Sequence, residues 1–253
     1  MKVLGLSFVR NAESRLAGCL DSMAAYCDDI CIVDDRSTDD TSNLARSHPA
    51  VSNVFAIDPM ISPGPWHIPE CLLLDLLYRM ADVNRPDWIV MLSDDERIED
   101  PYGIREKLSA ADAETVALQT YLVSSWSDPQ YPHMVPVMGQ ARSSVTRIWR
   151  YRPGLQPARK RLHNSYCPSN IADSGRVEFR DDITVSHAGW STLARRIAKV
   201  DLYQSLDPND ELNDGVPYDT GLLFGYKRER IPDLISEYHR RVALIRGEKC
   251  GNP

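Results

Sequence analysis

The sequence predicts an α/β fold with a mainly parallel central sheet covered by helices on both faces. In the first hundred residues, apolar runs without helical periodicity alternate with segments whose apolar residues recur every three or four positions. The apolar runs are 3–9, 30–33, 53–57 and 88–92, and the helical segments are 16–23, the stretch after Ser37-Thr38, and 69–80. Such β-α alternation is typical of parallel sheets, whose ligands gather at the carboxyl ends of the strands.

Polar residues predict where the first two helices begin. Asn11 is expected to cap the first helix, with Glu13 in its first turn. Ser37 or Thr38 is expected to cap the second, followed by two aspartates in the positive first turn.

The second half of the chain has a less regular pattern. Strands are expected at 116–123, 145–151 and 177–185 in a mixed or antiparallel region, and helices at 193–206 and 231–245. Nothing in the pattern indicates a repeat or a linker, so we expect a single domain over 1–253.

Composition narrows the class of protein. The 253 residues are 43% hydrophobic and carry a formal net charge of -7, which disfavours a nucleic-acid partner. The basic stretch between Arg142 and Arg161 could bind an anion, and a diphosphate would suit it as well as DNA would. No run of 18 apolar residues or signal peptide is evident, so a cytoplasmic location is expected. The six cysteines include no C-x-x-C pair, which indicates reduced thiols rather than a zinc site or disulfides.

Two acidic segments follow predicted strands. Asp94, Asp95 and Glu96 come directly after the strand at 88–92, and Asp34-Asp35 ends the strand at 30–33. Neighbouring carboxylates repel one another unless a cation or hydrogen bonds relieve the charge, so a divalent metal ion is one explanation. An ordinary polar turn and a well-capped helix start are the alternatives. Aspartates at a strand end can also accept hydrogen bonds from a nucleobase or a ribose hydroxyl.

These segments resemble a known family. Residues 31–41 (CIVDDRSTDDT) resemble the V-V-D-D-G-S-T-D-D-T signature of family 2 glycosyltransferases, which have the GT-A fold. Residues 8–13 resemble the family's first nucleotide-binding loop, and 89–97 its metal-binding D-x-D segment. Arg147-Ile-Trp149, His163-Asn164 and 187–190 (HAGW) resemble the R-x-[FW], H-E and H-x-G-[YW] elements of a bacterial subgroup.

The resemblance implies a Rossmann-like GT-A domain with a smaller, mixed acceptor-side region. Residues 1–100 would form the nucleotide-sugar-binding half, 101–200 the acceptor and metal-completing half, and 201–253 a C-terminal helical segment. Two positions depart from the family pattern. Ser93 replaces the first carboxylate of D-A-D-E, and Asn164 replaces the glutamate after His163, so ribose contact, metal affinity and the general base are affected.

The implied activity is transfer of a sugar from a nucleoside diphosphate sugar to an acceptor hydroxyl, inverting and dependent on Mn²⁺ or Mg²⁺. The metal would stabilise charge on the leaving diphosphate. The implied sites are as follows: nucleotide-sugar binding, Val9, Arg10, Asn11, Asp34, Asp35, Ser37, Asp94 and Arg147; metal, Asp95 and His187; general base, His163 or Asp128; acceptor binding, Trp126 and Trp190.

Other functions fit parts of the same pattern. A catalytically silent GT-A-like domain that binds nucleotides is favoured by Ser93 and Asn164, and a nucleotidyltransferase would share the α/β sheet and the metal. No G-x-G-x-x-G follows the first strand, which disfavours a dehydrogenase. The acceptor, whether glycan, lipid-linked, peptide or small molecule, is not indicated, and a homodimer through the C-terminal helices is compatible with the sequence.

Overall fold

The computed structural model describes residues 1–58, 60, 68–125, 140–160, 164–189, 191, 193–207 and 209. The chain divides into two compact units. The first comprises 1–123 and 142–187, and the second comprises 124–141 and 188–253. The sheet belongs to the first unit, apart from the ends of two strands, and every contact discussed below lies within this unit.

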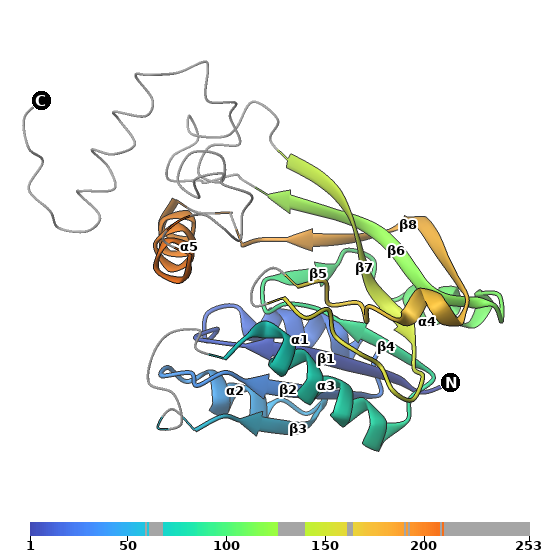
Figure 1. The fold of residues 1–253 in the computed structure, drawn as a ribbon, viewed down its shortest axis with the longest axis horizontal. Helices are drawn as coiled ribbons and strands as arrows, with labels where there is room; N and C mark the ends of the chain where they lie inside the picture. Colours follow the sequence, from blue (N-terminus) through green and yellow to red (C-terminus); the bar gives the residue numbers. More distant parts are fainter. Residues whose placement is uncertain are drawn as a thin grey trace, which may run out of the picture. The chain divides into compact units, whose positions relative to one another are not determined.

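The described strands form one sheet in the order β3-β2-β1-β4-β7-β6-β8-β5 (Figure 1). Their bounds are β1 Val3–Val9, β2 Asp29–Asp34, β3 Val51–Ala56, β4 Trp88–Met91, β5 Glu96–Ile98, β6 Thr115–Ser125, β7 Gln140–Arg150 and β8 Arg176–His187. The pairs β1–β2, β2–β3 and β1–β4 are parallel, whereas β4–β7 and β5–β8 are antiparallel. The predicted mainly parallel sheet with an antiparallel region is thus confirmed.

Among the described residues, the helices between the parallel strands are α1 Leu16–Ala24, α2 Thr41–Ser47 and α3 Glu70–Asn84. Helices α4 Ile104–Ala110 and α5 Leu193–Leu206 follow β5 and β8. The apolar stripe predicted for α1 is buried, because Leu16, Cys19, Leu20 and Met23 all face the core. The helix predicted at 231–245 lies outside the described residues. No helix in the described ranges is long and apolar enough to cross a membrane.

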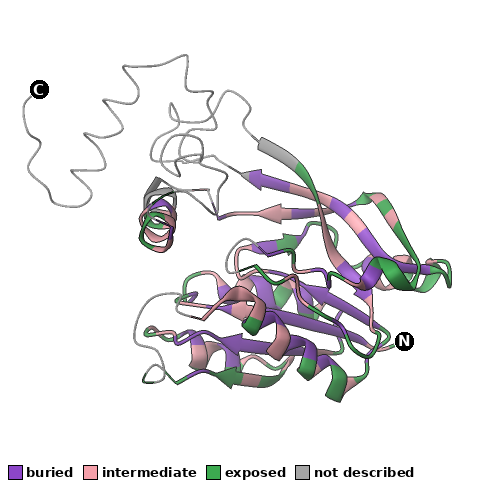
Figure 2. Ribbon diagram, viewed as in Figure 1, coloured by how far each residue is buried: buried purple, intermediate pink, exposed green. Residues whose placement is uncertain are grey.

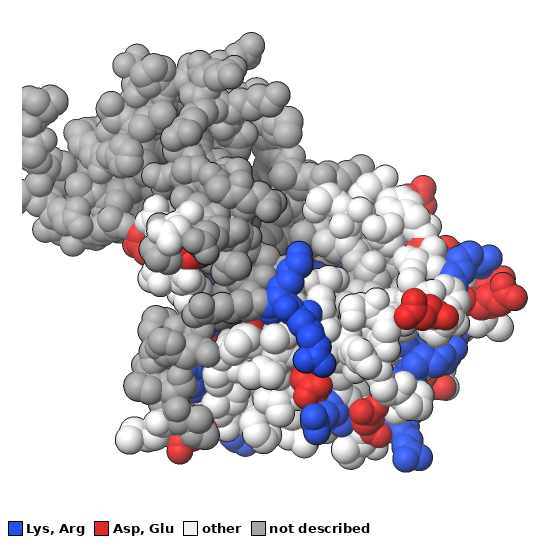
Figure 3. All heavy atoms as spheres, in the orientation of Figure 1, with Lys and Arg blue, Asp and Glu red and all other residues white. Residues whose placement is uncertain are grey.

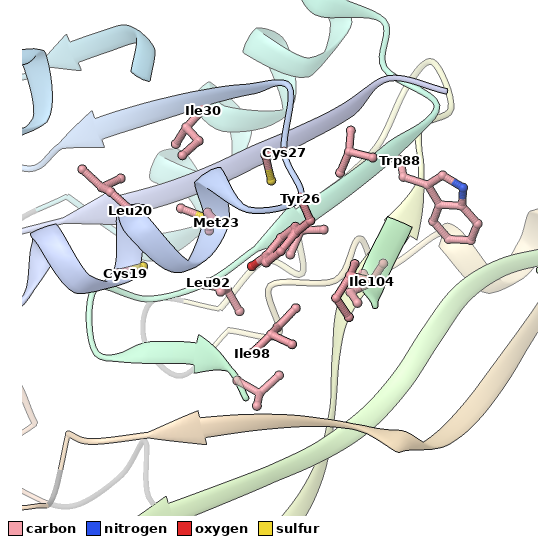
Figure 4. Packing of buried hydrophobic residues seen from close by; sticks show 14 of the residues in the cluster. Cys19, Leu20, Met23, Tyr26, Cys27, Ile30, Trp88, Leu92, Ile98 and Ile104 are labelled. Atoms are coloured by element: carbon pink, nitrogen blue, oxygen red, sulfur yellow. The ribbon is translucent and has the colours of Figure 1, made fainter. Parts of the chain in front are cut away.

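Two apolar cores cover the two faces of the sheet. Alternate residues of β2 face opposite cores. Ile30 and Ile32 belong to one core, and Cys31 and Val33 belong to the other. The first core contains residues of α1 and α4, and the second contains residues of α3. Figure 4 shows Cys19, Leu20 and Met23 of α1 in the first core, together with Tyr26 and Leu92. The central strands are therefore buried on both faces, which explains their continuous apolar runs (Figure 2).

The predicted helix caps were wrong. The residue before α1 is Arg15 rather than Asn11, and the residue before α2 is Asp40. Neither helix has an acidic residue in its first turn, so the predicted positions of Glu13 and of the two aspartates after Thr38 were wrong as well. The polar side chains expected to cap the helices instead join two loops, as described below.

Charges of both signs are interspersed over the face of the molecule shown in Figure 3. Several pairs contact each other, including Arg180 with Asp182, Lys107 with Asp182, and Arg176 with Asp112. The described residues on this face do not form one continuous basic area of the kind that binds a nucleic-acid backbone.

Candidate functional site

The strand order creates a topological switch point beside β1. The chain passes from β1 to β2 and β3 on one side and then returns to β4 on the other side of β1. Loops that leave the carboxyl ends of β1 and β4 therefore diverge. Ligands of open α/β sheets bind in the crevice at such a point.

The loops after β1 and β2 are joined by hydrogen bonds. The backbone N–H of Asn11 donates to Ser37 Oγ over 2.9 Å, and the N–H of Thr38 donates to Asn11 Oδ1 over 2.8 Å. The N–H of Ala12 donates to Thr41 Oγ1 over 2.7 Å. Asn11 has a φ of 45°, which turns its backbone toward the second loop. The two loops thus form one hydrogen-bonded unit.

The two aspartates at the end of β2 differ in their environment. Asp34 Oδ1 accepts the N–H of Ser37 at 3.0 Å, which closes the turn. Asp35 is fully buried, and its Oδ1 accepts from Arg36 Nε at 2.6 Å. Arg10 Nη1 donates to the backbone oxygen of Asp35 at 3.0 Å and lies 3.6 Å from Asp35 Oδ2.

The first aspartate after β4 is held by the start of α1. Arg15 Nε donates to Asp94 Oδ2 over 2.6 Å, and Arg15 Nη2 contacts the same oxygen. Arg15 Nη2 also donates to the backbone oxygen of Asn11 at 3.2 Å. One guanidinium therefore connects the loop after β1 with the loop after β4.

Strand pairing brings Asp95 and His187 together across 92 positions of sequence. Glu96 of β5 lies opposite His187 of β8 in the antiparallel register. His187 Nε2 is 3.5 Å from Asp95 Oδ2, and both side chains are largely buried. Within the described ranges, no three His, Cys, Asp or Glu side chains converge closely enough to hold a metal by themselves. A carboxylate oxygen and an imidazole nitrogen form a donor pair that suits Mn²⁺, with further ligands coming from a substrate.

Glu96 stabilises the turn that carries Asp95. The residue is 3% exposed, and its carboxylate receives Arg147 Nε at 2.9 Å, Arg147 Nη2 at 2.7 Å and the N–H of Ser93 at 3.1 Å. Burial alone lowers the pKa of Arg147, but the charge and hydrogen bonds of Glu96 outweigh burial, so the net pKa of Arg147 is raised. The bidentate pair anchors the segment that carries Asp95.

Tyr166 is a neighbour of this pair that sequence reasoning missed. Its hydroxyl lies 2.6 Å from Ser93 Oγ, and its ring lies 4.2 Å from the Arg147 guanidinium carbon. Burial, followed by the charge of Glu96, raises the pKa of Tyr166 well above its ordinary value, so the hydroxyl is neutral. Tyr166 comes from a loop without periodicity, and no motif identified it.

All ten predicted donor-side residues are described, and their contacts form three groups. Val9, Arg10, Asn11, Asp34, Asp35, Ser37 and Asp94 belong to the first group, Asp95 and His187 to the second, and Arg147 to the third. The predicted residues Trp126, Asp128, His163 and Trp190 lie outside the described residues. Asn164 is described, and it donates its N–H to Glu70 Oε2 at 2.8 Å and its side-chain amide to the oxygen of Lys160 at 2.6 Å. Asn164 therefore fastens its loop to the start of α3.

No protein-family profile matches the chain. Proteins of Mycobacterium tuberculosis and Mycobacterium bovis, both described as uncharacterised, are 45% identical to it over 242 residues. These alignments cover 96% of this chain and 60% of each relative, so the chain spans about 60% of the length of the curated relatives it matches.

Among solved structures, S. aureus TarS 1–349 in complex with UDP-GlcNAc is similar, with 13% identity and a TM-score of 0.46 over 97% of this chain and 79% of that one. Glucosyl-3-phosphoglycerate synthase from M. tuberculosis, in complex with Mn²⁺, UDP and glucosyl-3-phosphoglycerate, has 16% identity and a TM-score of 0.36 over 48% of this chain and 44% of that one. The fold and site described above stand on the chain's own geometry.

Proposed function

We propose that this chain is a glycosyltransferase of the GT-A type that uses a nucleoside diphosphate sugar and a divalent metal ion. The observation that carries the proposal is the approach of His187 to Asp95 at 3.5 Å, beside Asp94 and next to the joined loops after β1 and β2. A carboxylate and an imidazole that could hold a metal, beside hydrogen-bonded loops at the switch point of a parallel sheet, suit a diphosphate-linked donor.

The base and ribose of the donor would lie against the loops after β1 and β2. Asp35 Oδ2 and the Arg10 guanidinium offer a hydrogen-bond acceptor and a donor to the base. Val9, Asn11 and Ser37 shape the rest of this surface, and Asp34 maintains its turn through the N–H of Ser37. Ser93 and the neutral Tyr166 hydroxyl would face the ribose, where the family pattern has a carboxylate.

Asp95 Oδ2 and His187 Nε2 would hold Mn²⁺ or Mg²⁺, with diphosphate oxygens and water completing the coordination. When bound, the metal supplies electrostatic stabilisation of the diphosphate that leaves. Asp94 is kept beside it by Arg15, and Arg147 holds the turn through Glu96. Because Arg147 uses Nε and Nη2 on Glu96, Nη1 is the guanidinium nitrogen left for the diphosphate.

The acceptor hydroxyl would attack the anomeric carbon from the face opposite the diphosphate, which inverts the configuration. His163 and Asp128 are the proposed general bases, and Trp126 and Trp190 the proposed sugar-stacking residues. A base is needed within hydrogen-bond reach of the acceptor hydroxyl. Replacing His163 or Asp128 is expected to reduce kcat without abolishing nucleotide binding.

Melting temperatures with a panel of nucleoside diphosphates and their sugars, in Mn²⁺, Mg²⁺ or EDTA, test the proposal. At a ligand concentration of about 100 Kd, binding stabilises the fold by about 2.7 kcal/mol, or roughly 5–11 °C for a domain of this size. The shift should need metal and disappear in Asp95→Ala. The exposed Asp181 provides a matched control, since Asp181→Ala should retain the shift. Absence of any nucleotide-dependent shift in the wild type would sink the proposal.

A catalytically silent domain is the second candidate. Ser93 and Asn164 favour it, because Ser93 replaces a carboxylate and Asn164 is engaged with Glu70 and Lys160. Metal-dependent nucleotide binding without hydrolysis or transfer of any donor sugar would identify this case.

A further inference from the structure

Arg36 has an unusual backbone and an unusual environment. Its φ is 57°, in the left-handed region that favours glycine, and the residue is only 3% exposed. A side chain in this region is strained, and arginine is almost never fully buried without a partner. Such strain persists where the surrounding structure or a function requires it.

One partner of Arg36 is Asp35. Arg36 Nε donates to Asp35 Oδ1 over 2.6 Å, and the Asp35 side chain is 1% exposed. Because Oδ1 is engaged, the carboxylate cannot rotate freely, and the direction of Oδ2 is set.

The second oxygen of Asp35 lacks a hydrogen-bond donor. Within the described part of the chain, Asp35 Oδ2 is buried and has no hydrogen-bond donor. Arg10 Nη1 lies 3.6 Å away, which is beyond hydrogen-bond distance, and donates instead to the backbone oxygen of Asp35. A buried acceptor without a donor is unfavourable, and a bound N–H would remove this cost.

We propose that Arg36 is a positioning residue for nucleotide selection: by holding Asp35 Oδ1, it directs Oδ2 at the donor base. This inference rests on the proposed function, in which Asp35 lies against the base. An acceptor at Oδ2 with the Arg10 guanidinium close by matches a base edge on which a ring N–H adjoins a carbonyl. Uracil, thymine and guanine have such an edge. Adenine and cytosine present a ring nitrogen acceptor there, which Oδ2 repels.

The variant Arg36→Gly tests the inference. Glycine suits the positive φ, so this variant removes the guanidinium and relieves the backbone strain together. Arg85→Gly is the matched control, because Arg85 also has a positive φ, of 44°, but is exposed at the end of α3. Arg36→Lys retains a cation and serves as the conservative variant if Arg36→Gly is unstable.

The readout is calorimetric affinity for UDP, dTDP, GDP, ADP and CDP in the presence of Mn²⁺, with inorganic diphosphate as a probe that lacks a base. The wild type is expected to prefer one of the first three nucleotides over ADP and CDP. Arg36→Gly should reduce that preference about tenfold or more, the effect of one hydrogen bond to a charged group, and leave diphosphate affinity unchanged. Asp35→Asn should reduce the preference by a similar factor, and the double variant Asp35→Asn/Arg36→Gly should reduce it little further.

Three results would overturn the inference. An unchanged preference in Arg36→Gly would show that Arg36 does not direct Asp35. An equal loss for every probe, inorganic diphosphate included, would show that its role is structural support of the loop. A wild type that binds nucleotides but prefers ADP or CDP would contradict the proposed match to a base edge on which a ring N–H adjoins a carbonyl. A wild type that binds no nucleotide at all is a different result, since it removes the proposed function itself.

Discussion

Replacing Glu96 with alanine is expected to lower the free energy of unfolding by about 3–5 kcal/mol, the cost of leaving one member of a buried ion pair behind. The Glu96 side chain is 3% exposed and that of Arg147 is 12% exposed, so water cannot replace the lost carboxylate readily. The N–H of Ser93 loses its acceptor as well. For a domain of this size the loss corresponds to a fall of roughly 6–20 °C in melting temperature.

Urea unfolding of Glu96→Ala, Arg147→Ala and the double variant Glu96→Leu/Arg147→Met measures this effect. The double variant should cost less than the two single variants combined, because it leaves no buried charge unpaired. Asp75→Ala is the control, since Asp75 forms an exposed ion pair with Arg79 on α3 and should cost less than about 1 kcal/mol.

A cost below about 1 kcal/mol for Glu96→Ala would refute the reasoning. It would mean that the pair exchanges with solvent and does not anchor the turn that carries Asp95. The same variant should weaken metal-dependent nucleotide binding, because the Asp95 carboxylate is no longer held at a fixed distance from His187.

Further predictions concern stability and thiol reactivity. Hydrogen bonding to Arg180 holds the pKa of Asp182 below its ordinary value, so the stabilisation is fully present above about pH 4 and is lost as the pH falls through the lower folded-state pKa. Urea unfolding from pH 6 to pH 2.5 should show that the difference in the free energy of unfolding between wild type and Asp182→Asn becomes smaller in acid. A difference independent of pH would contradict this. Gly175→Ala should cost about 1–3 kcal/mol in the same assay, because an added Cβ would lie 2.5 Å from the backbone oxygen of Glu114, and a neutral result would argue against that close approach. Cys71 should be alkylated by iodoacetamide before the other cysteines that the structure describes, which are buried, and peptide mass spectrometry would reveal a different order.

The central strands could be predicted from sequence because burial on both faces leaves an uninterrupted apolar run. The expected strand at 3–9 has the bounds of β1, and those at 30–33 and 88–92 lie within one residue of β2 and β4 at each end. The buried stripe of α1 likewise follows from apolar residues three and four positions apart. Local patterns of this kind depend only on neighbours along the chain.

Features that depend on distant partners were not predicted. Asn11 and Ser37 carry the residue types of helix caps, but they bond to each other's loops across 26 positions. The short strand β5 exists through its pairing with β8, and three residues are too few to show a period. The positive φ of Arg36 was not predicted either, although the family signature quoted above has glycine at the matching position. The pairing of Asp95 with His187 was anticipated only through resemblance to a family.

The hydrogen bonds between the loop after β1 and the loop after β2 bear on how such a protein can be re-engineered. Since the N–H groups of one loop are satisfied by side chains of the other, a transplant of 34–41 from a relative would leave donors of 10–13 unpaired unless both segments move together. The two loops therefore have to be grafted together, and a substitution in one of them that removes such a hydrogen bond requires a matched change in the other.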